Sequence, residues 1–123
     1  MIRFKRLFKS FKYALTGLNK VFWEEQNFRI DLIIAILILW LAVFLKIMVW
    51  QFIILVLVIA LVLILEIINS IFERFVDLLK PRIHEYVKDI KDMTAAAVFI
   101  GALASIIIGI LIFLPYIVAR FFR

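Results

Sequence analysis

Three acidic residues and an asparagine recur at short, regular spacings inside a strongly apolar part of this chain: Glu66, Asn69, Glu73 and Asp77. At about 100° per residue, their directions around a helix axis fall within roughly 80° of one another, so all four share one face. An ionised carboxylate at the centre of a bilayer costs about 2.5–3.5 kcal/mol, which makes membrane-embedded acids candidates for function. Glu66 is the deepest of the four.

Further charged residues flank the apolar segments. Glu24 and Glu25 precede the first segment, and Lys91 with Asp92 precedes the last. Carboxylates that converge from separate helices would suit Mg²⁺, which proteins bind through one or two carboxylates together with substrate phosphates. Lys91 and Arg6 would suit the phosphates. Each of these residues is, taken alone, also typical of an ordinary interfacial charge.

A structural interpretation of the polar stripe stays open. Polar side chains within membrane spans form hydrogen bonds between helices, and Asn69 could act in this way alone. Glu73 and Asp77 lie nearer water, where the alternative is a solvated helix face with ion pairs to Arg74 or Lys80. Three acids on one stripe favour a functional role for Glu66.

Composition requires a membrane around most of the chain. The 123 residues are 67% hydrophobic and 20% charged, with a mean hydropathy of +1.17, whereas soluble domains are about half apolar and a quarter charged. Cysteine is absent and histidine occurs once, which excludes disulfides, thiolate metal sites and multi-histidine motifs. Glycine-rich phosphate loops and protein-kinase signatures are also absent. Without a linker-like stretch, residues 1–123 are expected to form a single domain.

Hydrophobic periodicity predicts four helices. Apolar and basic residues alternate at helical spacing near the N-terminus, which is typical of a helix lying on a bilayer. The next 34 residues, 32–65, contain only two polar side chains, Lys46 and Gln51; as one helix they would be about 51 Å long, against a hydrocarbon core of about 30 Å, so the chain must turn. The predicted ranges are a surface helix over about 3–26 and membrane spans over about 29–47, 50–79 and 92–119.

The charge distribution predicts orientation and partners. Residues 1–31 hold seven Lys and Arg and residues 73–92 hold five, which is 12 of the 15 in the chain. Three spans place both segments on one side, and the positive-inside rule assigns that side to the cytoplasm. Because the basic residues alternate with Phe and Leu, the net charge of +6 favours anionic lipid over nucleic acid. No convincing signal peptide is found, so the N-terminus is expected to remain in the mature protein.

Three segments resemble the prokaryotic diacylglycerol kinase and undecaprenol kinase family. Residues 66–77 (EIINSIFERFVD) resemble its E-x-x-N-x-x-x-E-x-x-x-D signature, residues 91–98 (KDMTAAAV) its K-D-M/A-x-A-A-A-V segment, and residues 25–29 (EQNFR) its E-x-x-F-R segment. The similarity covers nearly the whole chain in matching order and spacing. Asp31 stands where the family often has Glu, and Phe72 where a small Ala is usual.

This resemblance implies an all-α membrane protein with an N-terminal amphipathic surface helix and three transmembrane helices, assembled as a homotrimer with active sites shared between neighbouring subunits. Glu66 would be the general base that takes the proton from a lipid's primary hydroxyl, and Glu25 and Glu73 would hold Mg²⁺ against the β- and γ-phosphates of ATP. Asn69, Asp77, Lys91 and Asp92 would position the nucleotide and the catalytic groups. Arg6 and Tyr13 match positions that contact the nucleotide, and Gly17 matches a small residue of the surface helix.

The implied reaction is ATP-dependent phosphorylation of a membrane lipid at the cytoplasmic face of a bacterial inner membrane. The acceptor could be undecaprenol or diacylglycerol; residues 24–28 (EEQNF) and 109–115 (GILIFLP) look more like Gram-positive members, which favours the prenol. Two other classes stay open: a protein that conducts protons or ions through Glu66, and a small structural subunit whose charges face a partner. A conducting protein would not require Glu25, Glu73, Lys91 and Asp92 at these positions.

Overall fold

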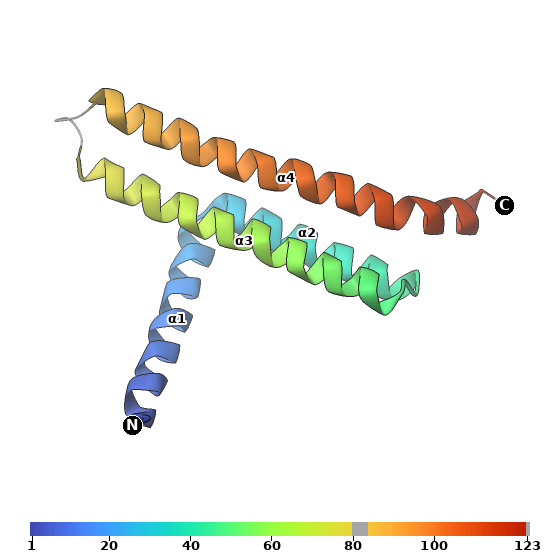
Figure 1. The fold of residues 1–123 in the computed structure, drawn as a ribbon, viewed down its shortest axis with the longest axis horizontal. Helices are drawn as coiled ribbons and strands as arrows, with labels where there is room; N and C mark the ends of the chain where they lie inside the picture. Colours follow the sequence, from blue (N-terminus) through green and yellow to red (C-terminus); the bar gives the residue numbers. More distant parts are fainter. Residues whose placement is uncertain (80–83, 123) are drawn as a thin grey trace.

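The computed structural model describes residues 1–79 and 84–122, and the ion pair considered above with Lys80 lies outside this part of the chain. The described residues form four helices (Figure 1). Their bounds are α1 Phe4–Glu24, α2 Gln26–Phe44, α3 Val49–Asp77 and α4 His84–Phe121. The predicted all-α architecture is confirmed.

Helix α1 leaves the other three helices at a steep angle (Figure 1) and has no buried residue. The bend that separates it from α2 lies at Glu25, whose backbone is extended. Arg29 of α2 stabilises this bend because its guanidinium donates hydrogen bonds to the carbonyl oxygens of Phe22 (3.0 Å) and Trp23 (2.8 Å). Those carbonyls belong to the last turn of α1, where backbone acceptors have no partner within the helix.

The turn between α2 and α3 occupies residues 45–48. The amide of Ile47 donates to the carbonyl of Ala42 and that of Lys46 to the carbonyl of Val43, at 3.3 and 3.2 Å, which is the hydrogen-bond pattern of a Schellman motif. Lys46 occupies its left-handed position with φ of 52°. Glycine is the usual residue there because it has no Cβ.

Helix α3 packs antiparallel to α4, and three contacts fix their register. At one end the Tyr116 hydroxyl donates to Gln51 Oε1 at 2.6 Å, beside an apolar cluster that includes Ala42, Leu55 and Phe113. Midway, Gly101 lies so close to Leu65 that a Cβ on the glycine would be 2.5 Å from Leu65 Cδ1. At the other end Lys91 Nζ lies 2.9 Å from Asp77 Oδ1.

Within the described part of the chain, three helices are long and apolar enough to cross a membrane: α2, α3 and α4 from Glu85 onward. Only 17% of the most apolar window of each is buried inside the chain, so most of their apolar surface needs lipid or another protein around it. With the exposed amphipathic helix α1, this matches the predicted surface helix and three spans. The structure describes one chain, and the homotrimer stays a prediction.

Candidate functional site

Glu66 is the centre of the acidic stripe on α3. Glu66 is 7% exposed. Among the described residues, Ser70 is the one other polar residue that is buried. Asn69 is half-buried, whereas Glu73 and Asp77 are exposed. Exposure therefore rises along the stripe away from Glu66, in the order that the helical spacing predicts.

Three further carboxylates lie within range of the charge of Glu66. Glu25 at the junction of α1 and α2, Asp31 of α2 and Glu73 of α3 all lie near enough for their charges to act on the Glu66 carboxyl group. Like charges at this range repel one another. A bound cation or a proton relieves such repulsion, so this end of the bundle favours binding of positive charge.

Arg74 links the junction of α1 and α2 to α3. Its Nη2 lies 3.7 Å from Glu25 Oε1 and contacts Glu24 Oε2 more closely. Arg74 was expected as a possible partner for Glu73 or Asp77, but its guanidinium contacts Glu24 and Glu25, which precede it by about 50 positions. Arg74 therefore sets where the Glu25 carboxylate lies relative to α3.

Asn69 and Glu73 lie one helical turn apart and are joined by a hydrogen bond. Asn69 Nδ2 donates to Glu73 Oε1 at 3.4 Å, which is longer than the usual 2.7–3.2 Å and correspondingly weak. Side chains four residues apart are neighbours on a helix surface. Asn69 can thus orient the Glu73 carboxylate without holding it rigidly.

The positively charged side chain of Lys91 lies at the exposed end of the acidic stripe. The Lys91 ammonium lies 2.9 Å from Asp77 Oδ1, and both residues make further interactions. Asp92 follows on α4 and is exposed. The stripe therefore passes from a buried carboxylate to a partly exposed ion pair, and an ammonium group can also interact with phosphate oxygens.

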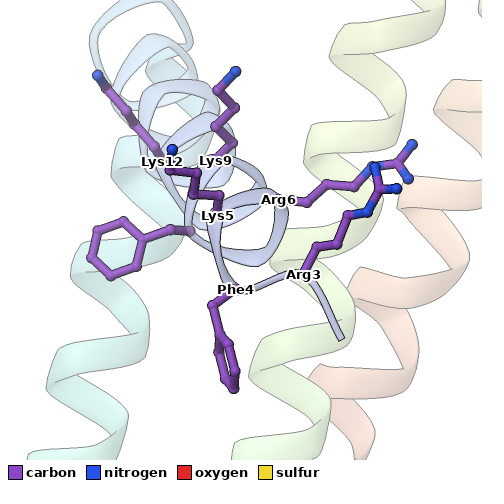
Figure 2. A pocket seen from close by; sticks show the side chains of 7 residues that line it. Arg3, Phe4, Lys5, Arg6, Lys9 and Lys12 are labelled. Carbon is purple, nitrogen blue, oxygen red and sulfur yellow. The ribbon is translucent and has the colours of Figure 1, made fainter. Parts of the chain in front are cut away.

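The predicted residues of α1 are not brought to this cluster within one chain. Arg6 precedes Glu25 by 19 residues, about 28 Å along a helix, and Tyr13 and Gly17 lie between them. Figure 2 shows side chains that line a pocket near the N-terminus, where Lys5, Lys9 and Lys12 point to one side and Arg3 and Arg6 to another. These exposed cations can bind phosphate groups of lipid or nucleotide.

The donor set fits Mg²⁺ only together with a ligand. Within residues 1–79 and 84–122, no group of three or more acidic or histidine side chains is arranged to hold a metal ion. Mg²⁺ takes oxygen donors and often binds through two carboxylates and substrate phosphates. Glu25 and Glu73, which both approach Glu66, supply two carboxylates of the required type.

Two residues of this site were not assigned a role by sequence analysis. In the sequence, Asp31 was noted only as a departure from the family pattern, and Arg74 only as a possible ion-pair partner of Glu73 or Asp77. Asp31 could have been singled out from the sequence, because it is a carboxylate at the start of a predicted span. The contact of Arg74 with Glu24 could not have been predicted, since helical periodicity does not report which helices pack together.

Comparisons with known proteins show which family the chain resembles. Residues 12–113 match the family described as prokaryotic diacylglycerol kinase. The chain is 38% identical over 112 residues to the undecaprenol kinase of Bacillus subtilis, covering 89% of each protein. It is 34% identical over 110 residues to a diacylglycerol kinase of Synechocystis, covering 89% of this chain and 63% of that protein. A diacylglycerol kinase of Helicobacter pylori is 36% identical over 98 residues, with 80% and 77% covered.

Proposed function

This chain belongs to the prokaryotic diacylglycerol kinase family and is a lipid kinase, and from this premise we propose that it transfers the γ-phosphate of ATP to the primary hydroxyl of undecaprenol or diacylglycerol. Residues 1–123 act as one catalytic domain. The observation that carries the proposal is the buried Glu66 carboxyl group, which lies within range of the charges of Glu25 at the junction of α1 and α2 and of Glu73 on α3 itself.

Glu66 is the general base of the proposed reaction. It accepts the proton of the lipid hydroxyl while that oxygen forms a bond to the γ-phosphorus, and the bond from this phosphorus to the bridging oxygen of ADP breaks. Phosphoryl transfer depends mainly on positioning and charge stabilisation, with little covalent work for the protein. A single base with phosphate-binding groups beside it is therefore a sufficient catalytic set.

Glu25 and Glu73 would hold Mg²⁺, and Asn69 would orient the Glu73 carboxylate through its hydrogen bond of 3.4 Å. When bound, Mg²⁺ neutralises charge on the β- and γ-phosphates. Lys91 would add positive charge at the phosphates, while Asp77 fixes the Lys91 ammonium at 2.9 Å. Asp92 would contribute to positioning the nucleotide beside them.

The acidic stripe is long enough to serve one substrate in the membrane and one in water. From Glu66 to Asp77 the helix rises about 16 Å, and the side chains change from buried to exposed along this distance. The base thus meets a lipid hydroxyl at the membrane boundary, while ATP stays in water. The distribution of Lys and Arg supports the cytoplasmic face of a bacterial inner membrane, with the N-terminus in the cytoplasm.

Completion of the site requires a neighbouring subunit. Arg6, Tyr13 and Gly17 are proposed to contact the nucleotide, yet Arg6 lies about 28 Å along α1 from Glu25 in its own chain. In a homotrimer with shared active sites, α1 of one subunit can reach the acidic stripe of the next. The exposed apolar surface of the three spanning helices supplies area for such an assembly.

A direct transfer assay tests the proposal. Purified protein in detergent receives Mg-ATP labelled at the γ-phosphate, and undecaprenol and diacylglycerol are offered in parallel. Labelled phosphate should appear on one or both lipids and disappear when EDTA removes the metal. Transfer to neither lipid would refute the proposal. Ion conduction through Glu66 would then be the better explanation, and proton flux measurements in proteoliposomes would test it.

A further inference from the structure

A second group of charged and aromatic residues lies at the end of the bundle that is opposite to Glu66. This far end is formed by the turn of residues 45–48 and by the last turn of α4, which lie at the same end of the spans (Figure 1). Glu66 follows Val49, the first residue of α3, by 17 residues, which is about 26 Å along the helix. The hydrocarbon core is about 30 Å thick, so the far end belongs to the opposite leaflet.

Positive charge at the far end has no acidic counterpart in the segments that build it. Lys46 belongs to the turn and Arg120 to the last turn of α4, and both residues are exposed. Residues 32–65 and 93–123 contain no Asp or Glu. No carboxylate of these segments can therefore neutralise the two cations, and the far end attracts anions from outside the chain.

Lys46 is an unusual residue for its position in two respects. Its φ of 52° is left-handed, where glycine is the usual residue. Its charge also lies on the side of the membrane opposite to 12 of the 15 Lys and Arg residues of the chain, where positive charge is disfavoured. Departures from such local rules are expected at functional sites, which indicates a use for the ammonium group itself.

Aromatic rings fix the orientation of Arg120. Its Cζ lies 4.6 Å from the centre of the Phe44 ring, and the Phe44 ring stacks on Trp40 with centroids 5.6 Å apart. A cation–π contact covers one face of the guanidinium and leaves the N–H groups in its plane available. Arg120 is thus pre-organised to donate hydrogen bonds to an anion, because less side-chain freedom remains to be lost on binding.

Gln51 connects the turn with α4. Its Oε1 accepts hydrogen bonds from the Met48 amide at 3.1 Å and from the Tyr116 hydroxyl at 2.6 Å. Met48 follows Lys46 by two residues. Tyr116 precedes Arg120 by about one helical turn. The shared acceptor and the cation–π contact therefore hold the two cation-bearing elements against each other.

Two tryptophans place the far end at the membrane boundary. Trp40 and Trp50 are 66% and 56% exposed, and tryptophan is enriched where hydrocarbon meets water. The phosphates of phospholipids lie at this same height. The aromatic surroundings of Lys46 and Arg120 thus favour a lipid headgroup over a soluble anion.

We propose that Lys46 and Arg120 bind the phosphate of an anionic phospholipid in the leaflet opposite to the acidic stripe. Arg120 donates N–H groups to the phosphate oxygens, and Lys46 adds a point charge. A zwitterionic headgroup binds less well, because its own ammonium group opposes the two cations. This site is separate from the acidic stripe and does not depend on the kinase reaction.

Quenching of tryptophan fluorescence by brominated lipids tests the site. The chain has three tryptophans, and Trp23→Phe leaves only Trp40 and Trp50 at the far end. The full chain with this change is placed in phosphatidylcholine bilayers that contain increasing amounts of brominated phosphatidylglycerol or brominated phosphatidylcholine. The ratio of the two quenching constants measures the preference for the anionic lipid, to which each cation should contribute about fivefold.

Substitutions in this background assign the preference to residues. Lys46→Gln and Arg120→Gln should each lower it about fivefold, and the double variant should show no preference. Arg120→Lys keeps the charge but loses the planar fork, so it should retain only part of the preference. Lys88→Gln is the matched control, because it removes an exposed cation from the other end of α4, and it should match the Trp23→Phe parent.

Equal quenching by the two lipids in the Trp23→Phe parent would overturn the proposal, as would an equal loss in Lys88→Gln. Inorganic phosphate that abolishes the preference at constant ionic strength would show that the ligand is a soluble anion instead. None of these measurements uses phosphate transfer, so their failure leaves the lipid kinase function unaffected.

Lys46→Gly separates binding from folding. Bound lipid stabilises the folded state, so phosphatidylglycerol should raise the unfolding temperature of the wild type. Lys46→Gly should be more stable than the wild type in phosphatidylcholine alone, because glycine suits the left-handed position. It should nevertheless gain less than the wild type when phosphatidylglycerol is added. An equal gain in both proteins would contradict a role for the Lys46 ammonium group.

Discussion

Lys91 Nζ lies 2.9 Å from Asp77 Oδ1, and this ion pair joins the start of α4 to the end of α3 across residues that are distant in sequence. Both side chains are partly exposed, at 33% and 55%. Ion pairs in contact with water contribute at most about 1 kcal/mol. The pair therefore adds little stability, and under the proposed function we expect Lys91 to bind phosphate.

Replacement of Lys91 by glutamine should separate these two roles. The free energy of unfolding should fall by less than about 1 kcal/mol, whereas kcat/KM for ATP should fall about 10- to 100-fold, because a hydrogen bond to a charged group is worth about 1.5–3 kcal/mol. Unfolding in mixed micelles and steady-state kinetics measure the two quantities. The double variant Asp77→Lys/Lys91→Asp restores an ion pair in reverse, and recovery of activity in it would show that the pair is structural only.

Arg74 and Glu24 should be weakly coupled in stability. Their side chains are 49% and 52% exposed, so a double-mutant cycle with Arg74→Gln and Glu24→Gln should give a coupling energy of about 0.2–1 kcal/mol. Arg74→Gln should in addition raise the KM for Mg-ATP, since Arg74 also positions Glu25. Glu24→Gln is the matched control and should leave this KM close to wild type. An equal rise in both variants would argue against a positioning role for Arg74.

The sequence predicted what depends on helical geometry and on the thickness of a bilayer. Asn69 and Glu73 are four residues apart, and their hydrogen bond follows from that spacing alone. The turn at Lys46 follows from an apolar run too long for a single span. Contacts between helices could not be predicted, because periodicity reports neither which helices pack nor at what height. The approach of Asp31 to Glu66 and the contact of Arg74 with Glu24 belong to this second group.

Replacement of Lys46 by glycine should stabilise the turn between α2 and α3. Lys46 has a φ of 52°, a conformation that costs residues with a Cβ about 1–2 kcal/mol. Glycine avoids this cost but loses more backbone entropy on folding, so a net gain of about 0.5–1 kcal/mol is expected. Unfolding in mixed micelles measures it. Lys46→Ala keeps the Cβ and removes the charge, so an equal gain in that variant would point to charge in place of backbone strain.

The two glycines of α4 should respond differently to alanine. At Gly101 a Cβ would be 2.5 Å from Leu65 Cδ1, whereas at Gly109 it would meet nothing within 4 Å. Both changes gain the same helix propensity, so the difference in unfolding free energy isolates the contact. Leu65 must leave its rotamer, and Gly101→Ala should be less stable than Gly109→Ala by about 0.5–1.5 kcal/mol. Equal stabilities would mean that α4 moves freely relative to α3.

The central claim is that Glu66 is the base of a lipid kinase. Glutamine has almost the same shape and cannot accept the proton, so the most direct measurement is phosphate transfer from Mg-ATP to undecaprenol and diacylglycerol by Glu66→Gln, with folding and ATP binding checked separately. Ser70→Ala is the control, since Ser70 is the other buried polar residue of α3. We expect kcat of Glu66→Gln to fall about 10²- to 10⁴-fold, with Ser70→Ala close to wild type. A folded Glu66→Gln protein with full kinase activity would contradict the account.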